Sequence, residues 1–499
     1  MESKNSPKKK KGKIIWRGFI YRIIFLFALI IFSYAGFLFY KIYNFEKNIY
    51  VETQNPATSQ TEKKTFLRST EDFLSGNVDS LKGSDRERIN ILLLGMGGEG
   101  HKGEYLTDTI MVASINPETY ETAFLSIPRD LYVKVPDYNI HTKINAVYTY
   151  ALRNESSSRS EAISLIKKTV EDATDQPIDY YAALDFKGFK KVVDELDGIK
   201  VNVEKDIVDH KYPGPNYSYQ TFKLDKGTHL LDGETALKYA RVRHTEGGDF
   251  ARAKRQQKVL AAARRKAFSA ENFLKPSKIS GLFNSLQDNL ITNIKFSEVP
   301  AFLNLAKNIN IYETTNKVLD AWESDSLLSV DHVFMGGVNA FVLVPRIGNY
   351  TEIQSLAKNI FQLDKIERQK EEIKKEEANI LIVGNNSKQL QEAQKLLQRM
   401  NYEPEVETKE ADNSPANCSK KLKIFENNNS QKLFTLNDLA QKFQTEVEKT
   451  KTDQKSDIII CVPDNSENLF HAETSSPDNF SEDSEGAAIV DEEGKVIYN

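Results

Sequence analysis

One stretch of the sequence reads Arg241-Val-Arg-His-Thr-Glu-Gly-Gly-Asp-Phe-Ala-Arg-Ala-Lys-Arg-Gln-Gln257. From Asp249 onward the composition is typical of a helix, which would place Asp249, Arg252 and Gln256 along one face at positions i, i+3 and i+7. Such a face presents a carboxylate, a guanidinium group and an amide together. The other cationic side chains of the stretch are Arg241, Arg243, Lys254 and Arg255.

A second helix is expected just upstream, over Asp232-Gly-Glu-Thr-Ala-Leu-Lys-Tyr-Ala240, with Asp232 as its N-cap. Arg241 and Arg243 follow its end and precede the break at Gly247-Gly248, so two helix ends would point guanidinium groups at one spot. Guanidinium groups bind phosphate oxygens bidentately, and each charge-assisted hydrogen bond contributes about 1.5–3 kcal/mol where water is excluded. A pyrophosphate is the ligand that could use so many cations. A solvated basic helix is the alternative interpretation.

Length, charge and cysteine content limit the classes of function. With 499 residues the chain has room for two or three domains, and its net charge of -4 gives no overall bias toward nucleic acid. The basic stretch also lacks interleaved aromatic residues, so we expect no nucleic-acid partner. Two cysteines, Cys418 and Cys461, exclude a disulfide-dense scaffold but leave one bridge possible. No spacing of cysteine or histidine fits a metal site.

The N-terminal part predicts a membrane anchor. Residues 19–40 form an apolar run whose last eighteen residues carry no charge, which is long enough to span a lipid bilayer. Because lysines and arginines crowd its N-terminal side, we expect a cytoplasmic tail over 1–18 and everything after the anchor outside the cell membrane. Residues 41–87 are polar and predict an extracytoplasmic stalk. Ser33-Tyr-Ala35 leaves a cleaved signal peptide as the alternative.

Residues 88–363 predict a layered α/β domain, in which a sheet carries flanking helices. The expected elements are strands over 89–95, 110–115 and 122–127, helices after Lys143 and over 160–173, a strand–helix–strand unit over 180–203, and a mostly helical part over 266–363 with a strand at 340–345. The three apolar strands could line a pocket for an apolar ligand. They equally fit a buried core.

Polar features stand at the ends of these strands. The loop Gly95-Met-Gly-Gly-Glu-Gly-His-Lys-Gly103 could cradle a phosphate, but it lacks the ending of a P-loop, so a plain surface loop is the alternative. Asp108 precedes the second strand, where a carboxylate could hold Mg²⁺ against a phosphate or cap a turn. Arg129 follows Pro128 at the end of the third strand, a usual place for a functional group in an α/β layer.

The C-terminal part predicts a linker, a second domain and a tail. Charged residues over 364–377 are typical of a solvated helical linker. A small α/β domain without a catalytic set is expected over 378–463. Its elements would be strands at 379–384, 403–408 and 457–462 and helices at 387–400 and 436–450. Residues 464–499 are acidic and poor in aromatic residues, which predicts disorder.

Six motifs in order resemble those of the LytR–CpsA–Psr family over roughly residues 88–265, with weaker similarity to about Phe361. They are Asp108-Thr-Ile-Met-Val, Leu125-Ser-Ile-Pro-Arg-Asp, Lys143-Ile-Asn-Ala, Asp185-Phe-Lys-Gly-Phe, Leu231-Asp-Gly-Glu-Thr-Ala-Leu, and Tyr239-Ala-Arg-Val-Arg-His with Asp249-Phe-Ala-Arg-Ala-Lys-Arg-Gln-Gln. Family members are membrane-anchored α/β proteins that bind polyprenyl-pyrophosphate glycans and transfer the glycan phosphate to peptidoglycan, usually to a muramic acid 6-hydroxyl. The part over 378–463 is similar to a C-terminal domain often appended to this family.

The resemblance implies a role for each matching residue. The catalytic set would be Arg129, Arg241, Arg243 and Asp249, of which Asp249 would orient arginines or accept a proton. The residues that bind the pyrophosphate and lipid head group would be Lys143, Arg252, Arg255 and Gln256.

The resemblance also implies a Mg²⁺ cofactor, for which the sequence departs from the family pattern. Asp108 matches one of the two aspartates that hold the ion in the family. The place of the other is taken by Gly97, and the arginine usual two residues before the first is replaced by Leu106. The substitutes considered for the missing ligand are Glu99, His101 and Glu104.

The sequence therefore predicts an extracytoplasmic phosphotransferase that attaches a glycopolymer, such as teichoic acid or capsule, to peptidoglycan. Arginines and Mg²⁺ would neutralise the charge around phosphorus, a sugar hydroxyl would attack, and polyprenyl phosphate would leave. With water as the nucleophile, the same site would be a pyrophosphatase. With Gly97 in place of the aspartate, the domain could instead bind polyprenyl-linked glycans without turnover, as a carrier or regulator.

Overall fold

The computed structural model describes residues 81–101, 103–154, 158–214, 218–246, 248–267, 286, 289–295, 298–309, 314–322, 325–335, 338–408, 422–463, 489–490 and 496–497. The expected cytoplasmic tail, the anchor at 19–40 and the stalk up to residue 80 lie outside these ranges. Among the described residues, no helix combines the length and the apolar character that crossing a bilayer requires.

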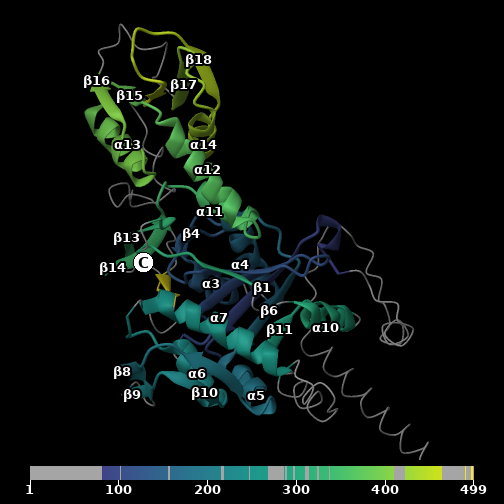
Figure 1. The fold of residues 1–499 in the computed structure, drawn as a ribbon. Helices are drawn as coiled ribbons and strands as arrows, with labels where there is room; N and C mark the ends of the chain where they lie inside the picture. The colour runs from purple at the N-terminus through teal and green to yellow at the C-terminus, as the bar shows by residue number, and fades with distance from the viewer. Residues whose placement is uncertain are drawn as a thin grey trace, which may run out of the picture.

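A mixed six-stranded sheet forms the centre of the first domain (Figure 1). Its strands stand in the order β11–β6–β1–β2–β3–β12. β1 runs parallel to β6 and β3 runs parallel to β12, whereas the other neighbours are antiparallel. This confirms the layered α/β prediction. The bounds are β1 Ile89–Met96, β2 Thr109–Ile115, β3 Thr122–Ile127, β6 Tyr180–Asp185, β11 Leu290–Thr292 and β12 Thr315–Val318.

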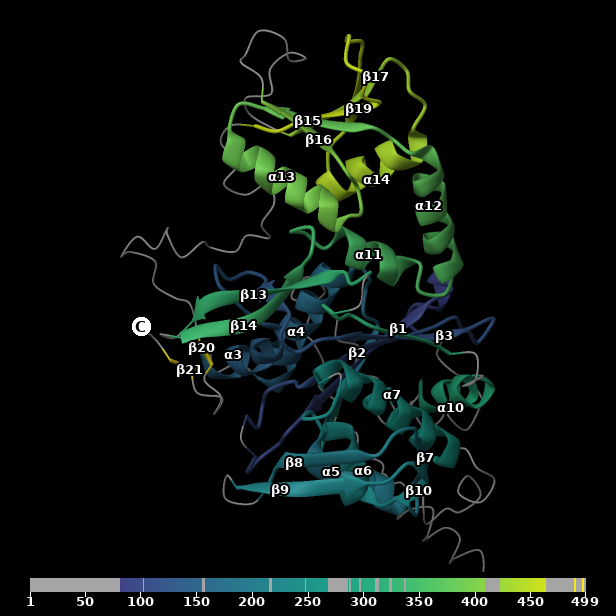
Figure 2. The same cartoon turned by 60° about the vertical axis from the view of Figure 1, so that its left-hand side comes forward.

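The two faces of the central strands have different coverings. The helices involved are α3 (Val147–Asn154), α4 (Arg159–Thr174) and α7 (Gly248–Ala267). Leu92 and Leu94 of β1 pack into the main core with residues of α3 and α4. Successive side chains of a strand point to opposite faces, so Ile91 and Leu93 point the other way, into a cavity that α7 also lines. Figure 2 shows α7 running along this second face of the sheet.

A smaller layer packs on α7 from the side away from the sheet (Figure 2). Its elements are α5 (Phe186–Glu195), β7 (Ile199–Val203), β8 (Ile207–Pro213), β9 (Tyr219–Leu224), β10 (Gly227–Leu231) and α6 (Gly233–Arg241). β7 pairs with β10, β8 pairs with β9, and one apolar cluster joins them to α6 and α7. α6 begins as expected, because the Asp232 carboxylate accepts a 2.8 Å hydrogen bond from the Thr235 N–H. The layer thereby fixes Arg241, the last residue of α6, beside α7.

The prediction that residues 266–363 are mostly helical is wrong in large part. β11 and β12 add a strand to each edge of the main sheet, and β13 (Leu328–Met335) pairs with β14 (Val338–Pro345) in a hairpin. β11 and β12 have three and four residues, too few for an apolar period, and Asp331 and His332 interrupt the apolar pattern of β13. Pairing with a neighbour therefore decides the structure of these strands. The helices described here are α10 (Val299–Asn308) and α11 (Thr351–Lys358). Short elements elsewhere in the domain are η1 (Ser84–Arg86), β4 (Tyr132–Lys134), β5 (His141–Lys143) and η2 (Ile144–Ala146).

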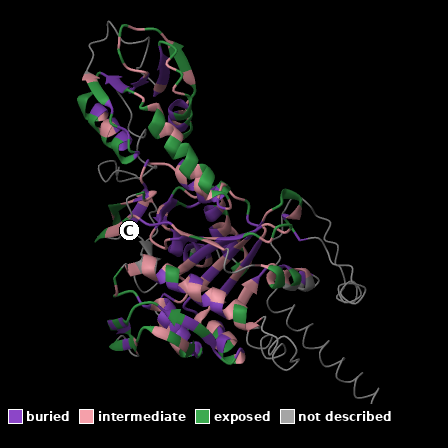
Figure 3. Ribbon diagram, in the orientation of Figure 1, coloured by how far each residue is buried: buried purple, intermediate pink, exposed green. Residues whose placement is uncertain are grey.

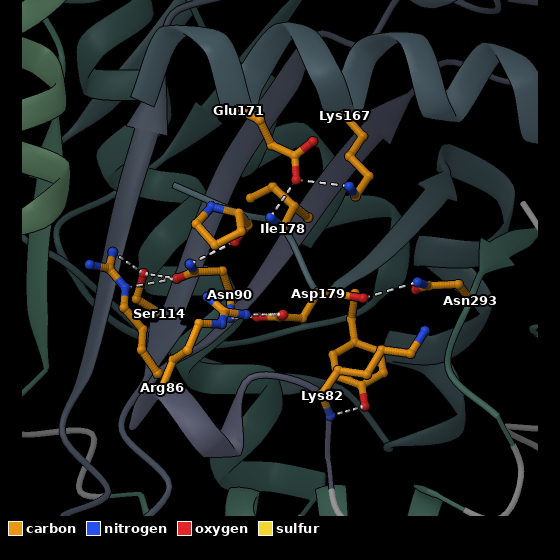
Figure 4. A network of polar contacts seen from close by, with 12 residues as sticks. Lys82, Arg86, Asn90, Ser114, Lys167, Glu171, Ile178, Asp179 and Asn293 are labelled. Carbon is orange, nitrogen blue, oxygen red and sulfur yellow. Dashed lines mark hydrogen bonds and ion pairs between the residues drawn. The ribbon is translucent and has the colours of Figure 1, made fainter. Parts of the chain in front are cut away.

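At the edge where β1 begins, polar side chains bond to one another (Figure 4). The Asp179 carboxylate accepts a 2.8 Å hydrogen bond from the Asn90 N–H and another from Arg86. Arg88 donates to Asn90 Oδ1 at 2.9 Å, to Ser114 Oγ at 2.8 Å, and to a carbonyl of α11. Burial, with the charge of Arg86, lowers the pKa of Arg88 to about 10. These bonds hold β1, β2 and α11 together, so the polar side chains at this end of β1 stabilise the fold.

A second, five-stranded sheet follows in the order β16–β15–β19–β17–β18, as the small α/β domain predicted. The expected helix over 436–450 is wrong beyond Phe443, because residues 447–450 pair with β17 as a strand. β17 itself was not expected. Figure 3 shows α12 as largely exposed, in line with the solvated helix predicted there. The bounds are α12 Leu363–Glu376, β15 Ile380–Gly384, α13 Ser387–Arg399, β16 Glu405–Thr408, β17 Lys423–Asn427, α14 Leu433–Phe443, β18 Val447–Thr450 and β19 Ile458–Cys461.

Two details concern the C-terminal part of the chain. Cys461 is buried at the end of β19 and is disulfide-bonded, whereas Cys418 lies outside the described residues. Within the tail predicted to be disordered, residues 489–490 and 496–497 pair as the short strands β20 (Ile489–Val490) and β21 (Val496–Ile497). The other residues of the tail lie outside the described ranges, so the prediction of disorder stays a prediction for them.

A buried ionic network joins the two domains. Glu352 of α11 accepts two 2.7 Å hydrogen bonds from Arg346, and its carboxylate lies 3.2 Å from the Nζ of Lys442 in α14. Lys442 also pairs with Asp438 at 2.8 Å, and the Asp438 carboxylate accepts a 2.7 Å hydrogen bond from the Tyr402 hydroxyl. The exposed fractions of the Lys442 and Glu352 side chains are 15% and 8%, so water screens these pairs little.

We expect Glu352→Gln to lower the free energy of unfolding by about 3 kcal/mol at neutral pH, because it would leave buried cations without their anion. Burial alone raises the pKa of Glu352, but the hydrogen bond from Arg346 and the charge of Lys442 outweigh it, so the pKa lies below its ordinary value. The carboxylate thus stabilises the fold above the ordinary glutamate pKa. That contribution is lost as the pH falls through the folded-state pKa.

Urea unfolding at about pH 7 and about pH 4 measures this effect, and the gap between the wild type and Glu352→Gln should narrow at the acid pH. The control is Glu371→Gln on the exposed surface of α12, which should change stability by less than about 0.5 kcal/mol. If the wild type and Glu352→Gln differ in the free energy of unfolding by the same amount at both pH values, the lowered pKa assigned to Glu352 is contradicted.

Candidate functional site: a cationic strand edge beside an apolar cavity

The segments that carry the expected site residues meet where the central strands of the main sheet end, and we call this end of the strands the strand edge. β1, β3, β6 and β12 end at this edge, and β2 begins there, because β2 runs antiparallel to β1 and β3. Asp108 comes just before β2, Arg129 follows β3, and Phe186 follows β6. In α/β layers, ligands bind beyond the carboxyl ends of the strands. Residues distant in sequence therefore share one strip of surface.

Asp108 is the anion at the centre of a first basic group. Its Oδ1 accepts a 2.8 Å hydrogen bond from Arg129 Nη1 and a 3.2 Å hydrogen bond from Asn145 Nδ2. Arg252 of α7 donates from Nη2 to the backbone carbonyl of Asp108 at 3.1 Å. Arg252 is 7% exposed, whereas the Asp108 side chain is 36% exposed, so a ligand can reach the group from the carboxylate side.

The surroundings of Asp108 keep it ionised. Burial alone raises the pKa of this carboxyl, but the charges of Arg129 and Arg252 and the hydrogen bonds from Arg129 and Asn145 outweigh it, and the pKa lies below its ordinary value. A carboxylate with a lowered pKa is a weak base. In this geometry Asp108 holds two guanidinium groups in place and is unsuited to accept a proton.

Two residues of this group were missed by the sequence reasoning. Asp130 lies 2.8 Å from the Lys143 Nζ and 3.4 Å from the Arg129 Nε, so it holds both cations beside Asp108. Asn145 donates to Asp108, as described above. Each stands one or two positions from a predicted residue, within the Pro-Arg-Asp and Lys-Ile-Asn motifs. Their presence in those motifs was the signal that could have found them.

Arg241 forms a second group with aromatic side chains. Its guanidinium carbon lies 4.2 Å from the centroid of the Phe186 ring and 5.7 Å from that of Tyr212, and Nη1 donates to the Tyr212 hydroxyl at 3.5 Å. His101 of the glycine-rich loop packs edge-on against Phe186 at 5.3 Å between ring centroids. Burial, followed by the charge of Arg241, lowers the pKa of His101. Stacking covers the guanidinium plane and directs the N–H groups at its rim outward.

The two basic groups lie within reach of one small ligand. β1 stands between β6 and β2, so Phe186, just after β6, and Asp108, just before β2, are separated by two strand spacings, or about 10 Å. A pyrophosphate held between long arginine side chains fits such a gap. Gly97 follows β1 and therefore stands between the two groups.

Arg255 and Gln256 bond to the end of α6. Arg255 is buried and donates from Nε to the carbonyl of Tyr239 at 3.1 Å and from Nη2 to the carbonyl of Val242. Gln256 Nε2 donates to the carbonyl of Ala240 at 3.5 Å. The last carbonyls of a helix have no partner within the helix, so these bonds fix the exit of α6 on α7. Binding of the head group by either residue stays a prediction.

The loop between α6 and α7 depends on Asp209 of β8, which the sequence reasoning also missed. Its carboxylate accepts hydrogen bonds from the backbone N–H groups of Arg243 and His244 at 3.4 and 3.3 Å and lies 3.1 Å from His244 Nδ1. The Arg243 side chain is exposed. Asp249 lies in the first turn of α7, but its side chain is outside the described part of the structure. Both of their predicted roles stay predictions.

An apolar cavity lies between the sheet and α7. It reaches Pro128, the residue before Arg129, and Thr245 in the loop between α6 and α7, and it continues around β12 into the joint between the domains. The whole hollow measures about 2080 Å³, more than the ~300–1,000 Å³ of a usual small-molecule site. The apolar strands thus line a pocket with one face and a core with the other. Among the apolar residues that line it are Ile91, Leu93, Ala113, Ile115, Phe124, Val318, Leu260 and Ala261.

The residues present do not by themselves fit a magnesium site. Among the described residues, no group of three or more His, Cys, Asp or Glu side chains could hold an ion. Asp108 is bonded to Arg129 and Asn145. Of the substitutes considered, His101 contacts Phe186, and Glu104 accepts a 3.4 Å hydrogen bond from a loop N–H. Mg²⁺ prefers six oxygen ligands in octahedral geometry, of which this edge offers one carboxylate.

Fold and site together define a layered α/β protein with clustered cations beyond the ends of its central strands and a large apolar cavity on one face of its sheet. The model of the LytR_cpsA_psr family matches residues 45–328. The chain belongs to this family, as the resemblance predicted.

Several known proteins are similar to this chain. "Regulatory protein MsrR" of Staphylococcus aureus (strain COL) is 34% identical over 214 residues, which cover 42% of this chain and 58% of that protein. "Polyisoprenyl-teichoic acid--peptidoglycan teichoic acid transferase TagV" of Bacillus subtilis (strain 168) is 30% identical over 342 residues, covering 68% and 78%. The crystal structure of B. subtilis TagV is 27% identical with a TM-score of 0.42, covering 55% of this chain and 96% of that one. The chain thus spans less than two thirds of the length of MsrR.

We expect Gly97→Asp to create a metal site next to Asp108. A Cβ at residue 97 would lie 3.1 Å from the Cβ of His101, a contact that a small shift of the loop relieves. Two carboxylates hold a divalent ion better than one, so the affinity for Mn²⁺ should rise about tenfold or more, equivalent to about 1.4 kcal/mol. Titration calorimetry with Mn²⁺ on the protein without substrate measures this.

The matched control is Gly100→Asp, which adds the same charge in the same loop where a Cβ meets no atom within 4 Å. Its φ of +84° is left-handed, a conformation that aspartate adopts at a lower cost than most residues. Gly100→Asp should leave the Mn²⁺ affinity unchanged. If both variants gain the same affinity for Mn²⁺, the added charge and not the position of residue 97 is responsible, and the expectation fails.

Proposed function

We propose that this chain is a phosphotransferase that attaches a polyprenyl-pyrophosphate-linked glycopolymer, of the teichoic acid or capsule kind, to peptidoglycan. The observation that supports it most is that two arginine groups lie beyond the ends of nearby strands of one sheet, a face of which lines an apolar cavity. A diphosphate bonded to a long isoprenoid needs cations at one end and an apolar enclosure at the other. Few other ligand classes need both.

The relatives support the same reaction class. TagV carries the name of a teichoic acid transferase that uses a polyisoprenyl-linked donor and a peptidoglycan acceptor. A transferase from Bacillus licheniformis with a name of the same form, TagU, is 28% identical over 294 residues. MsrR is named a regulatory protein, which agrees equally with a regulatory alternative.

The transfer can be written with balanced bonds. An acceptor hydroxyl oxygen attacks the phosphorus that bears the glycan and forms a new P–O bond, while the bond from that phosphorus to the bridging oxygen breaks. Polyprenyl phosphate leaves with the bonding electrons, and the hydroxyl proton passes to a base or to water. Arg129, Arg252 and Arg241 would neutralise the charge on the phosphate oxygens, which is the main protein contribution that such a reaction needs.

The remaining roles in this mechanism follow from the charges. Asp108 would position Arg129, since its lowered pKa makes it a poor base. Asp249 is proposed as the group that orients arginines or accepts the proton, as its place in the family motif implies. Lys143 would add a cation beside Arg129, because both contact Asp130.

Two further parts of the proposal rest on the sequence. Mg²⁺ would be held by Asp108 only together with oxygens of the substrate phosphates, since the edge lacks a second carboxylate. Residues 19–40 would span the cell membrane with the N-terminus inside. This orientation would put the site on the side where lipid-linked glycans meet peptidoglycan.

One observation favours a second candidate function. Gly97 stands where the family usually places its second metal-binding aspartate, and the described residues contain no cluster of three or more His, Cys, Asp or Glu that could hold an ion. The chain could then bind polyprenyl-linked glycans without turning them over. A pyrophosphatase would use the same cations with water as the nucleophile, and no feature of the site favours it over transfer.

We expect Arg241→Ala to lower the rate of transfer about a hundredfold or more, because it removes a fixed cation next to the reacting phosphate. The assay uses the full chain in detergent micelles with a synthetic polyprenyl-pyrophosphate saccharide and peptidoglycan fragments, with and without Mg²⁺. Arg265→Ala is the control, since Arg265 is an exposed arginine near the other end of α7. It should change the rate less than about twofold.

The products distinguish the candidates. Sugar–phosphate covalently bound to peptidoglycan supports transfer, provided that it disappears in Arg241→Ala. Release of free glycan phosphate would show that the reaction is hydrolysis and not transfer. Binding of the donor with no product, with or without the metal, would favour the non-catalytic binder.

A further inference from the structure

Four rings form an aromatic shelf beside the first basic group. We define the shelf as Phe250 of α7, Trp322 after β12, and His332 and Phe341 of the hairpin β13–β14. Phe250 and Trp322 have ring centroids 4.9 Å apart, Trp322 and Phe341 6.3 Å, and His332 and Phe341 6.0 Å. The proposed transfer chemistry uses none of these side chains.

The shelf and the arginine groups share their supporting elements. Phe250 and Arg252 both stand in the first turns of α7, and Arg252 bonds to the backbone of Asp108. β12 is parallel to β3, so Trp322 and Arg129 follow neighbouring strands at the same edge. The Leu343 N–H of β14 donates to the carbonyl of Asp130 at 2.9 Å. These connections place the shelf on the β12 side of the first basic group. Figure 1 shows the hairpin near one end of α7.

Hydrogen bonds hold the backbone at Trp322 in place, while its side chain stays exposed to solvent. Its backbone N–H donates to Asp320 Oδ1 at 3.0 Å, and Ser326 Oγ bonds to the carbonyl of Asp320, which fixes the turn. The residue nevertheless keeps 62% of its surface exposed. An indole supported by rings beneath it and open above offers a flat apolar face to a ligand.

The hairpin of the shelf lacks the basic residues of a bilayer-binding surface, although Lys254 stands one turn from Phe250 on α7. β13 and β14 contain Asp331 and His332 but no lysine or arginine. A surface that binds anionic lipids usually carries basic residues. A neutral ligand with an apolar face and a polar rim suits the shelf better.

We propose that the aromatic shelf binds the sugar ring that is joined to the pyrophosphate of the donor. The C–H groups on one face of a pyranose pack on an aromatic ring, while its hydroxyls stay in water or meet polar groups such as His332. Phe250, Trp322 and Phe341 line the same hollow as Ile91, Leu93 and Leu260. The isoprenoid would occupy the part between the sheet and α7, and the sugar ring would lie on the exposed Trp322. This inference rests on the proposed function in taking a polyprenyl-linked glycan as the ligand, and it names a subsite for the glycan.

The experiment compares two probes on the full chain in detergent micelles. One is farnesyl pyrophosphate, and the other is a farnesyl diphosphate whose terminal phosphate carries a single N-acetylglucosamine. The wild type should bind the sugar-bearing probe more tightly. Trp322→Ala should weaken that binding by up to about tenfold, the range for one aromatic contact, and leave the sugar-free probe unchanged. Trp322→Phe should keep most of the preference, because a ring remains.

The control is Phe334→Ala, which removes an exposed ring of the same hairpin outside the shelf. It should bind both probes like the wild type. Equal weakening of both probes by Trp322→Ala would place the ring on the lipid or the diphosphate and overturn the proposal, as would no weakening at all. If Trp322→Ala and Phe334→Ala both reduce binding to phosphatidylglycerol vesicles and the sugar preference persists, the surface is a membrane contact and the proposal fails.

These measurements are separate from a failure of the proposed function. They record binding and need no turnover, so an inactive chain can still show a preference for the sugar. Conversely, transfer that depends on Arg241 but not on Trp322 would support the phosphotransferase and reject the shelf.

Discussion

The concentration of positive charge at one edge of the main sheet is the constraint on which the rest of the first domain depends. Arg129, Arg252 and Lys143 lie close together, and like charges disfavour one another unless anions or aromatic rings stand between them. Asp108 and Asp130 supply the anions. Arg241 is instead stacked on Phe186 and Tyr212. The fold thus keeps several guanidinium groups near one ligand site while each retains a partner of its own.

This balance explains why the supporting elements are arranged as they are. The cations follow β3 or lie in β5, α6 and α7, and each needs a rigid attachment to keep its place. Arg255 and Gln256 fasten the exit of α6 to α7, and Asp209 fastens the loop that follows. Residues with sequence patterns typical of ligand binding therefore also act as braces for the arginines beside them. At the opposite edge of the sheet, Asp179 and Arg88 serve cohesion, and their bonds are to other residues of the chain.

The second domain bears on the site through the cavity it helps to enclose. The hollow that begins beside α7 continues into the joint where Glu352, Arg346 and Lys442 meet. A buried ion pair gives fixed geometry at the cost of desolvation. The joint holds α14 against α11. The orientation of the second domain therefore contributes to the shape of the hollow where it enters the joint. The charged helix α12, which the sequence indicated only as a linker, lines this part through Leu363 and Ile366.

The amino-acid sequence by itself determined the α/β class, the strands β1 to β3, the helices α6 and α7, and the family, because long apolar runs and ordered motifs are local properties of the chain. It also pointed to Arg129, Asp108 and Arg252, which the structure brings into contact. It did not reveal β12 or the place of Trp322, since a strand of four residues forms only through pairing with a distant neighbour. Nor did it reveal β13, because Asp331 and His332 interrupt the apolar pattern of its eight residues. Nor could it separate Leu93 from Leu94, whose identical side chains line the cavity and the core respectively. Only the tertiary structure decided that difference, because it depends on which helix covers each face of the sheet.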